Sequence, residues 1–277
     1  MDRTITRILN AQDIIDDGDM RLRRALPQRQ LSALGPFVFL DHYRHKSQRG
    51  IGDRPHPHAG IEVVSYLLEG GVEHRDSMGF RDRLGPGDAQ FIRTGRGMLH
   101  AEQPLGGRHG LQLWTSLPPE LKQVEPSYAS LRAAEIPEIA GEGSSLRVAA
   151  GRVNGVQGPM ALSGGALFAR LQLEPRATAA LEFDADLELG LYVLQGQVTV
   201  GETQLATGML GLLGSGTSVR IAARGDEQIE LILIGGEPVK GEVLFSGPFV
   251  MDTPERLAQA EQDFAMGRMG RLEGVPY

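Results

Sequence analysis

The sequence predicts an all-β protein built from two barrels of the same kind, with one short helix near its C-terminal end. The chain has 277 residues, which is enough for two domains of ordinary size. It contains 37 glycines, and short runs of β-branched and aromatic residues alternate with turn signals, as in proteins made of many short strands. Residues 66–74 and 192–200 share one pattern: an aromatic residue, two apolar residues, a polar residue and glycine, then a second strand. Two similar barrels would produce such a repeat.

The first half of the chain contains apolar and alternating segments that are separated by turn residues. Strands are expected at residues 35–43, 61–70, 71–79 and 109–118. The pair Gly70-Gly71 predicts a turn between the second and third of these strands. Further turns are expected at residues 86–88 and 95–97, where glycine lies beside proline, aspartate or arginine.

The second half also consists of short apolar segments that are separated by turn residues. A proline-interrupted segment at residues 119–140 separates the two halves. This connector predicts two domains, residues 1–135 and 136–277. Strands of the second domain are expected at residues 166–175, 187–213, 218–225 and 228–238. The tail predicts a helix that Thr253 caps, that starts at Pro254 and that Gly267 ends.

Composition excludes several classes of function. The net charge of −7 argues against direct binding to nucleic acid, because phosphates repel an acidic surface. There is no cysteine, so disulfides and thiolate metal sites are ruled out. The N-terminal segment carries acids where a signal peptide needs an apolar core, and apolar stretches such as 229–236 are too short to span a bilayer. We expect a soluble, cytoplasmic monomer without a membrane partner.

The histidines are the main chemical signal in the sequence. All seven lie at or before position 109, so only the first barrel can hold a histidine metal site. His56 and His58 are two residues apart, and so are His100 and Glu102. On extended strands, such pairs face the same side. Four ligands would then converge on one divalent metal ion, for which iron, manganese, nickel, copper and zinc are all suitable. Two coordination positions of an octahedron would remain open for dioxygen or a chelating substrate.

The other titratable residues of this region have less specific readings. His74 follows the glycine pair and is interpreted as a structural histidine, although it could line the same pocket. Glu62 lies four residues after His58 and would share its face on a regular strand. We expect Glu62 to support the ligands or the fold rather than bind the ion. His42, His45 and His109 are expected to be structural or exposed.

The motifs around these histidines are specific to one family, because the sequence resembles the pirin family of cupins. The first cupin motif is present as Gly50, His56, His58 and Glu62, and the second surrounds Gly87, Gly97 and His100, with Glu102 two residues on. Further similar segments are 35–43, 109–118, 124–128 and 235–270. The resemblance therefore covers nearly the whole chain. Ser246 departs from the family pattern, which leaves details of the second domain open but does not affect the metal motifs.

The resemblance implies two cupin barrels (double-stranded β-helix, or jelly-roll, folds) packed face to face, with a metal site in the first only. It implies His56, His58, His100 and Glu102 as ligands and iron(II) as the ion, with copper, nickel, manganese and zinc as alternatives. The implied activity is that of a quercetin 2,3-dioxygenase, in which a flavonol binds at the metal and dioxygen opens its central ring. Glu102 is then the catalytic base for the 3-hydroxyl proton.

The sequence is also compatible with two other functions. The chain could be an iron-dependent, redox-sensing regulator that modulates a protein partner such as a transcription factor or a metabolic enzyme. It could also be a metal-stabilised protein that acts on a different small molecule, because cupins support many chemistries and the fold alone does not identify a reaction.

Overall fold

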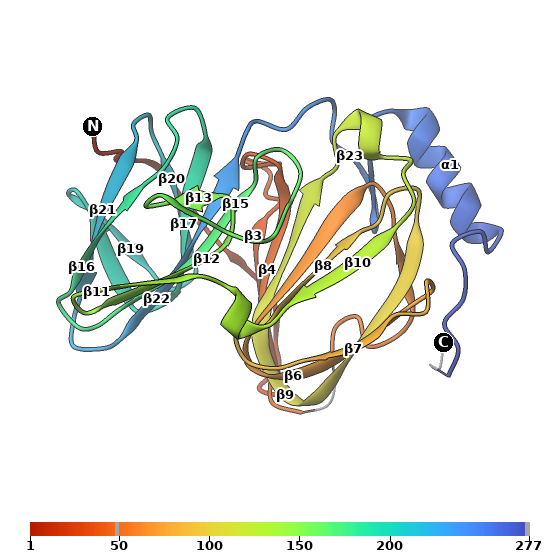
Figure 1. Ribbon diagram of the computed structural model, residues 1–277, viewed down its shortest axis with the longest axis horizontal. Helices are drawn as coiled ribbons and strands as arrows, with labels where there is room; N and C mark the ends of the chain where they lie inside the picture. The colour runs from red at the N-terminus through yellow and green to blue at the C-terminus, as the bar shows by residue number, and fades with distance from the viewer. Residues whose placement is uncertain (48–49, 275–277) are drawn as a thin grey trace. The chain divides into compact units, whose positions relative to one another are not determined.

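The structure is a computed structural model that describes residues 1–47 and 50–274. Its described residues are mostly β-strands, with one α-helix near the C-terminal end (Figure 1). The chain divides into two compact units, which are each built from several segments. The N-terminal unit comprises Asp13–Arg24, Val38–Ala133 and Val239–Tyr277, and the C-terminal unit comprises Met1–Gln12, Ala25–Phe37 and Ala134–Pro238.

The N-terminal unit is built around a nine-stranded sheet. The strand order is β10-β8-β6-β9-β4-β3-β2, with β5 paired to β9 and β7 paired to β6. The strands are β2 (Gln12–Asp16), β3 (Met20–Leu26), β4 (Phe37–His45), β5 (His56–His58), β6 (Ile61–Asp76), β7 (Arg81–Leu84), β8 (Ala89–Arg93), β9 (Met98–Ser116) and β10 (Ser127–Leu131). Single 3₁₀ turns at Pro119–Leu121 and Ala133–Glu135 flank β10.

Strands β6 and β9 form one long antiparallel pair, and this corrects a prediction. The turn expected at Gly70-Gly71 is absent, because β6 runs unbroken from Ile61 to Asp76. The pairing instead shifts register between Leu67 and Glu69 and again between Gly70 and Val72. Gly70 has a φ of +78°, and a Cβ there would lie 2.0 Å from the carbonyl oxygen of Gly107. The glycine therefore allows a bulge that bends the long strand without ending it.

The C-terminal unit has a seven-stranded and a four-stranded sheet, in the orders β1-β20-β17-β22-β15-β12-β11 and β16-β21-β18-β19. The larger sheet contains β1 (Ile5–Asn10), β11 (Glu138–Gly141), β12 (Ser144–Ala150), β15 (Leu167–Leu173), β17 (Glu188–Gln195), β20 (Met209–Leu213) and β22 (Ile229–Gly236). The smaller contains β16 (Thr178–Glu182), β18 (Gln197–Val200), β19 (Thr203–Ala206) and β21 (Ser218–Arg224), and β13 (Arg152–Val153) pairs with β14 (Val156–Gln157).

The core of the C-terminal unit is apolar. Its cluster of buried residues consists of aliphatic side chains and Phe183, with Leu191, Leu231 and Leu233 among the fully buried ones. The N-terminal unit differs, because its buried residues include several histidines, carboxylates, hydroxyls and an amide. Among the described residues, the buried imidazoles and carboxylates all lie in the N-terminal unit, and such groups need partners when they are buried.

Each end of the chain belongs to the unit that is formed mainly by the other half of the sequence. The predicted domains, 1–135 and 136–277, are contiguous and do not include this exchange. Strand β1 pairs with β20 of the C-terminal unit. Next to it, the guanidinium of Arg3 donates hydrogen bonds to four carbonyl oxygens of that unit. At the other end, β23 (Leu244–Ser246), β24 (Phe249–Met251) and α1 (Pro254–Ala265) belong to the N-terminal unit. Pairing and packing override sequence order here, since contacts between distant segments decide which strands share a core.

The C-terminal segment packs behind the short strand β5. Val250 donates its backbone N–H to the carbonyl of Ala59 at 3.1 Å, and Met251 and Ala260 join a buried cluster with Ala59 and Leu99. The predicted helix is confirmed, because the Thr253 hydroxyl accepts the backbone N–H of Arg256 and Pro254 occupies the first turn. This segment therefore buttresses the strand that carries His56 and His58.

One buried amine links the C-terminal segment to the sheet. Lys122 is fully buried, and its Nζ donates to the carbonyls of Gly60 and Val250, each at 2.9 Å, and to the hydroxyl of Ser116 at 2.8 Å. Burial lowers the pKa of Lys122 to about 8. The three acceptors use all three donors of an ammonium group, which explains how this side chain can be buried without a carboxylate partner.

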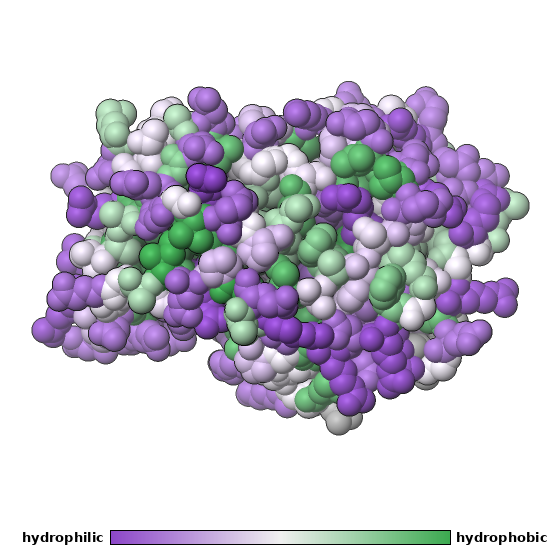
Figure 2. All heavy atoms as spheres, viewed as in Figure 1, coloured by the Kyte–Doolittle hydropathy of each residue, from purple (hydrophilic) through white to green (hydrophobic). Residues whose placement is uncertain are grey.

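On the face drawn in Figure 2, apolar residues reach the surface in small separate groups among hydrophilic ones. Among the described residues, no helix has the length and hydropathy needed to cross a bilayer. The face-to-face packing of the two barrels stays a prediction.

Candidate metal centre

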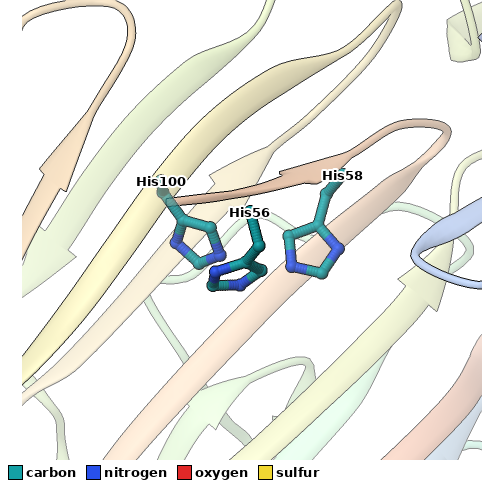
Figure 3. Close-up of side chains that lie close together, drawn as sticks. All are labelled: His56, His58 and His100. Atoms are coloured by element: carbon teal, nitrogen blue, oxygen red, sulfur yellow. The ribbon is translucent and has the colours of Figure 1, made fainter. Parts of the chain in front are cut away.

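Three histidine rings converge on two neighbouring strands of the N-terminal unit. His56 and His58 lie on β5, and the register places His100 of β9 directly opposite His56. Figure 3 shows the three imidazoles projecting from these strands to a common side. The ring centroids of His56 and His100 are 4.3 Å apart, and those of His58 lie 5.0 Å from each. One nitrogen of each ring lies within 4.8 Å of one nitrogen of the other two.

Backbone carbonyls fix the orientation of two of these rings. The Nδ1 of His56 lies 2.9 Å from the carbonyl oxygen of Arg54, and the Nδ1 of His58 lies 3.3 Å from that of Pro248. Since a carbonyl oxygen can only accept, each Nδ1 carries the proton and each Nε2 keeps its lone pair. Ligating histidines commonly use their second nitrogen in this way. Pro248 precedes β24, so the C-terminal segment helps to orient His58.

Two of the three histidines have ring nitrogens without a partner in the described part of the chain. His58 Nε2 and both ring nitrogens of His100 are buried and have no hydrogen-bond partner among the described residues. Burial is the main cause that lowers the pKa of His58 and of His100 well below 6.5, and the electrostatic influence of the neighbouring His56 ring adds to it. Both rings are therefore neutral at pH 7. Buried lone pairs without donors are costly, and neutral imidazoles are good ligands for first-row divalent metals. These residues fit a metal ion.

Glu102 lies on β9, as His100 does, but it belongs to a second group of potential metal ligands. It is grouped with His100 and His74, whereas the first group holds the three histidines. The reason is the register, because Glu102 is paired with His74 across β6 and β9, and His100 is paired with Asp76. His100 belongs to both groups. The structure thus brings the three predicted histidines together and places the predicted glutamate beside His100.

Three buried donors hold the carboxylate of Glu102. Its Oε1 accepts the hydroxyl of Ser65 at 2.8 Å and the amide of Gln90 at 2.5 Å. Its Oε2 accepts Nη1 of Arg108 at 3.3 Å. Sequence reasoning did not find Ser65, Gln90 or Arg108, because no short spacing links them to the histidine motifs. Only the alternation along β6, which puts Ser65 on one face, offered a signal.

The hydrogen bond of His74 to Asp76 fits the predicted structural role, but the ring of His74 also lies beside His100. It is fully buried, its Nε2 lies 3.0 Å from Oδ2 of Asp76, and its ring stacks on Tyr128 at a centroid distance of 4.4 Å. Its centroid is 5.6 Å from that of His100. Asp76 also accepts the backbone N–H of Met78 and that of Phe80, so the turn after β6 fixes the carboxylate that orients His74.

The remaining predicted residues lie outside the histidine cluster. Glu62 is fully buried, but it accepts bonds from Arg93 and from Thr115 at 2.9 Å. On β6, alternation puts Glu62 on the face opposite to Ser65, so it does not share the face of the cluster. His42 and His109 face each other through their Nε2 atoms at 2.7 Å, and burial lowers the pKa of His42 to about 3. His45 is buried.

A cavity of about 610 Å³ lies in the C-terminal unit, where Asn154, Glu174 and Leu181 are among its lining residues. It includes none of the seven histidines. It is therefore separate from the metal centre.

Comparison with known proteins identifies the family. The sequence profile described as Pirin matches residues 19–115, and that described as Pirin C-terminal cupin domain matches residues 168–270. Human Pirin is 35% identical over 257 residues, which cover 90% of this chain and 88% of the human protein. This chain belongs to the pirin family. A Pirin-like protein of Caulobacter vibrioides is 35% identical over 277 residues, 96% of this chain and 99% of that one.

Solved structures show that the fold of this pirin is a two-domain cupin fold, as predicted. A quercetin 2,3-dioxygenase from Acinetobacter baumannii has a TM-score of 0.88 and 26% identity, with coverage of 98% of this chain and 99% of that chain. Bacterial pirin YhhW from Escherichia coli, in a complex with nickel(II), has a TM-score of 0.65 and 21% identity over 84% of this chain and 100% of its own. The second likeness supports the fold alone.

Proposed function

We propose that this pirin is a metal-dependent dioxygenase that opens the central ring of quercetin-type flavonols with dioxygen. The observation that carries the proposal is the cluster of His56, His58 and His100, in which Nε2 of His58 and both ring nitrogens of His100 are buried without a hydrogen-bond partner among the described residues. The similarity to a protein described as quercetin 2,3-dioxygenase, over nearly the full length of both chains, supports the choice of substrate class.

The three histidines would hold the metal ion, and Glu102, which lies beside His100, would be the fourth ligand. Iron(II) is the proposed ion, with copper, nickel, manganese and zinc as alternatives. When bound, the ion would supply Lewis acidity, which stabilises the deprotonated 3-hydroxyl of a flavonol. The flavonol and dioxygen together would yield a depside and carbon monoxide, which balances all atoms of the two substrates.

Glu102 is the proposed base for the 3-hydroxyl proton. The oxygen Oε1 is engaged by two short bonds, from Ser65 and Gln90, whereas Oε2 has a longer bond of 3.3 Å from Arg108. Oε2 is therefore the oxygen that can accept a proton with the smallest loss of hydrogen bonding. Ser65 and Gln90 would keep the carboxylate aimed beside His100 throughout.

The test begins with anaerobic purification, metal analysis and reconstitution with iron(II). Quercetin is then added in air, and its absorbance and the released carbon monoxide are followed. We expect metal-dependent decay in the wild type, loss of bound metal and of decay in His56→Ala, and normal decay in His109→Gln, a histidine outside the cluster. Glu102→Gln should keep the volume of the side chain but lower the rate by about 10²–10⁴-fold, as expected for removal of a general base.

Two results would contradict the proposal. Full turnover in His56→Ala would show that the histidine cluster is not the reaction centre. Bound iron without any decay of quercetin would remove flavonols as substrates and favour the regulatory hypothesis, in which the metal state alters binding to a protein partner.

A further inference from the structure

A row of aromatic rings connects the histidine cluster to the surface of the N-terminal unit. From His100 the row passes to His74, at a centroid distance of 5.6 Å, and then to Tyr128, at 4.4 Å and nearly parallel. Tyr128 stacks in turn on Phe80 at 5.5 Å. Phe80 has 48% of its surface exposed. The row therefore ends in solvent.

Tyr128 is the readily oxidised member of this row, and it has a proton acceptor. Its hydroxyl lies 3.0 Å from Oδ2 of Asp82. Burial and the neighbouring Asp82 raise the pKa of Tyr128, so the phenol is neutral at pH 7. For Asp82, burial raises the pKa, but hydrogen bonds from Arg132 and other donors outweigh it and leave the pKa at about 2. An ionised carboxylate thus faces a neutral phenol, which becomes a strong acid when it loses an electron.

The same hydroxyl is also linked to Glu102. It lies 3.3 Å from Oε1 of Gln90, whose amide nitrogen donates to Oε1 of Glu102. Tyr128 therefore contacts the centre twice, through the stacked ring of His74 and through one amide. Neither contact requires Tyr128 to be a ligand.

We propose that Tyr128 relays single electrons from anionic donors in solution to a metal ion in the histidine cluster, an inference that rests on the proposed metal site. Tyr128 gives one electron to the oxidised ion, and its phenolic proton moves to Asp82, which leaves a neutral phenoxyl radical. A one-electron donor of the ascorbate class then reduces the radical, and the proton returns from Asp82. The net change is one electron moved from donor to metal, with Tyr128 and Asp82 restored.

The surface beside Phe80 explains the choice of an anionic donor. Glu73 accepts hydrogen bonds from Arg75, Arg81 and Arg83, so three guanidinium groups surround one carboxylate. Arg81 and Arg83 have exposed side chains, and Arg81 directly follows Phe80 in the chain. Since excess positive charge at a surface raises the local concentration of anions, an anionic reductant is drawn to the exposed end of the row.

A second aromatic row lacks these features. His58 contacts Trp114, which stacks on Phe39 at 4.0 Å, and the guanidinium of Arg24 lies over Phe39. The Nε1 of Trp114 is buried without a hydrogen-bond partner among the described residues, so a proton released on oxidation has no acceptor there. The guanidinium also disfavours positive charge on the neighbouring rings. Tyr128 is therefore the preferred route.

The experiment compares rates of metal reduction in iron(III)-loaded protein, without any organic substrate. Wild type, Tyr128→Phe, Asp82→Asn and Trp114→Phe are mixed with ascorbate in a stopped-flow instrument, and loss of the ferric signal is recorded per bound iron. Tyr192→Phe, a fully buried tyrosine of the C-terminal unit, is the matched control. We expect Tyr128→Phe and Asp82→Asn to react about tenfold more slowly, equivalent to about 1.4 kcal/mol of added barrier, and Tyr192→Phe to react at the wild-type rate. The wild-type rate should fall as salt is added, since salt screens the arginines.

Other outcomes overturn the proposal. Equal rates in Tyr128→Phe and wild type, at equal iron content, would refute the relay while leaving the metal site intact. A slower rate in Trp114→Phe alone would transfer the route to the second row. Failure of the wild type to bind iron would overturn both the relay and the metal site. Absence of quercetin turnover leaves the relay unaffected, because no quercetin is used.

Discussion

The buried amine of Lys122 provides a sharp test of the packing behind the metal centre. In Lys122→Met, the carbonyls of Gly60 and Val250 and the hydroxyl of Ser116 lose their donor. Three buried acceptors without a donor cost about 1 kcal/mol each at the lower end of the usual range. The variant, however, no longer carries a buried charge. The removal of this charge stabilises the folded state, and this relief opposes the loss of the hydrogen bonds.

The size of that relief follows from the pKa of Lys122, which burial lowers from 10.5 to about 8. Since a tenfold change in proton affinity is about 1.4 kcal/mol, protonation of the buried amine costs about 3 kcal/mol. Below pH 8 both the folded and the unfolded chain bind this proton. Between pH 8 and 10.5 only the unfolded chain binds it, so the free energy of unfolding of the wild type rises with pH across this window.

The expected result is a pH-dependent difference between wild type and Lys122→Met. At pH 7 the loss of hydrogen bonds and the relief nearly cancel, so urea unfolding should give similar free energies for the two proteins. At pH 10.5 the wild type should be more stable by about 3 kcal/mol. Lys240→Met, at an exposed position, should change stability by at most about 0.5 kcal/mol at every pH. A difference between wild type and Lys122→Met that does not vary with pH would refute the reasoning.

Three further changes test other parts of the structure. His100→Ala should abolish iron binding in equilibrium dialysis, because His100 belongs to both groups of potential ligands, while circular dichroism remains native. Leu231→Ala, in the apolar core of the C-terminal unit, should lower the free energy of unfolding by about 2–5 kcal/mol without changing metal content; a metal-depleted variant would contradict the separation of the two interiors. Thr253→Ala removes the cap of α1 and should cost about 1 kcal/mol in urea unfolding, whereas Thr253→Ser should be close to wild type.

The site was predictable where spacing alone determines geometry. His56 and His58 flank a single proline on an extended strand, so their convergence follows from strand periodicity. The pairing of His100 with His56 depends on the register between two strands, at residues that are 44 positions apart, and the sequence suggests it only through the repeated spacing of two. Glu102 shows the limit of this reasoning, because its partners Ser65, Gln90 and Arg108 lie on strands whose neighbours the sequence does not specify.

The fold was predictable in class and in its local elements. Thr253 and Pro254 predicted the start of α1 correctly, because capping is a local property. Gly70 was misread as a turn, since a positive φ serves a bulge equally well. The exchange of terminal segments between units could not be predicted, because it results from long-range pairing such as that of β1 with β20. The cytoplasmic location, the monomeric state and the use of Glu102 as a ligand and base stay predictions.

The exchange of segments has a consequence for the order in which the protein can mature. His58 is oriented by the carbonyl of Pro248, and Ala59, which follows β5, is buried in a cluster that includes residues as far along the chain as Leu272. A chain growing on the ribosome has made His56, His58 and His100 long before it makes these supports. The histidine pocket can therefore reach its final form only after the chain has been translated as far as Leu272. Tight capture of metal should thus be a late event, and nascent chains that end before residue 248 should hold the ion more weakly than the finished protein.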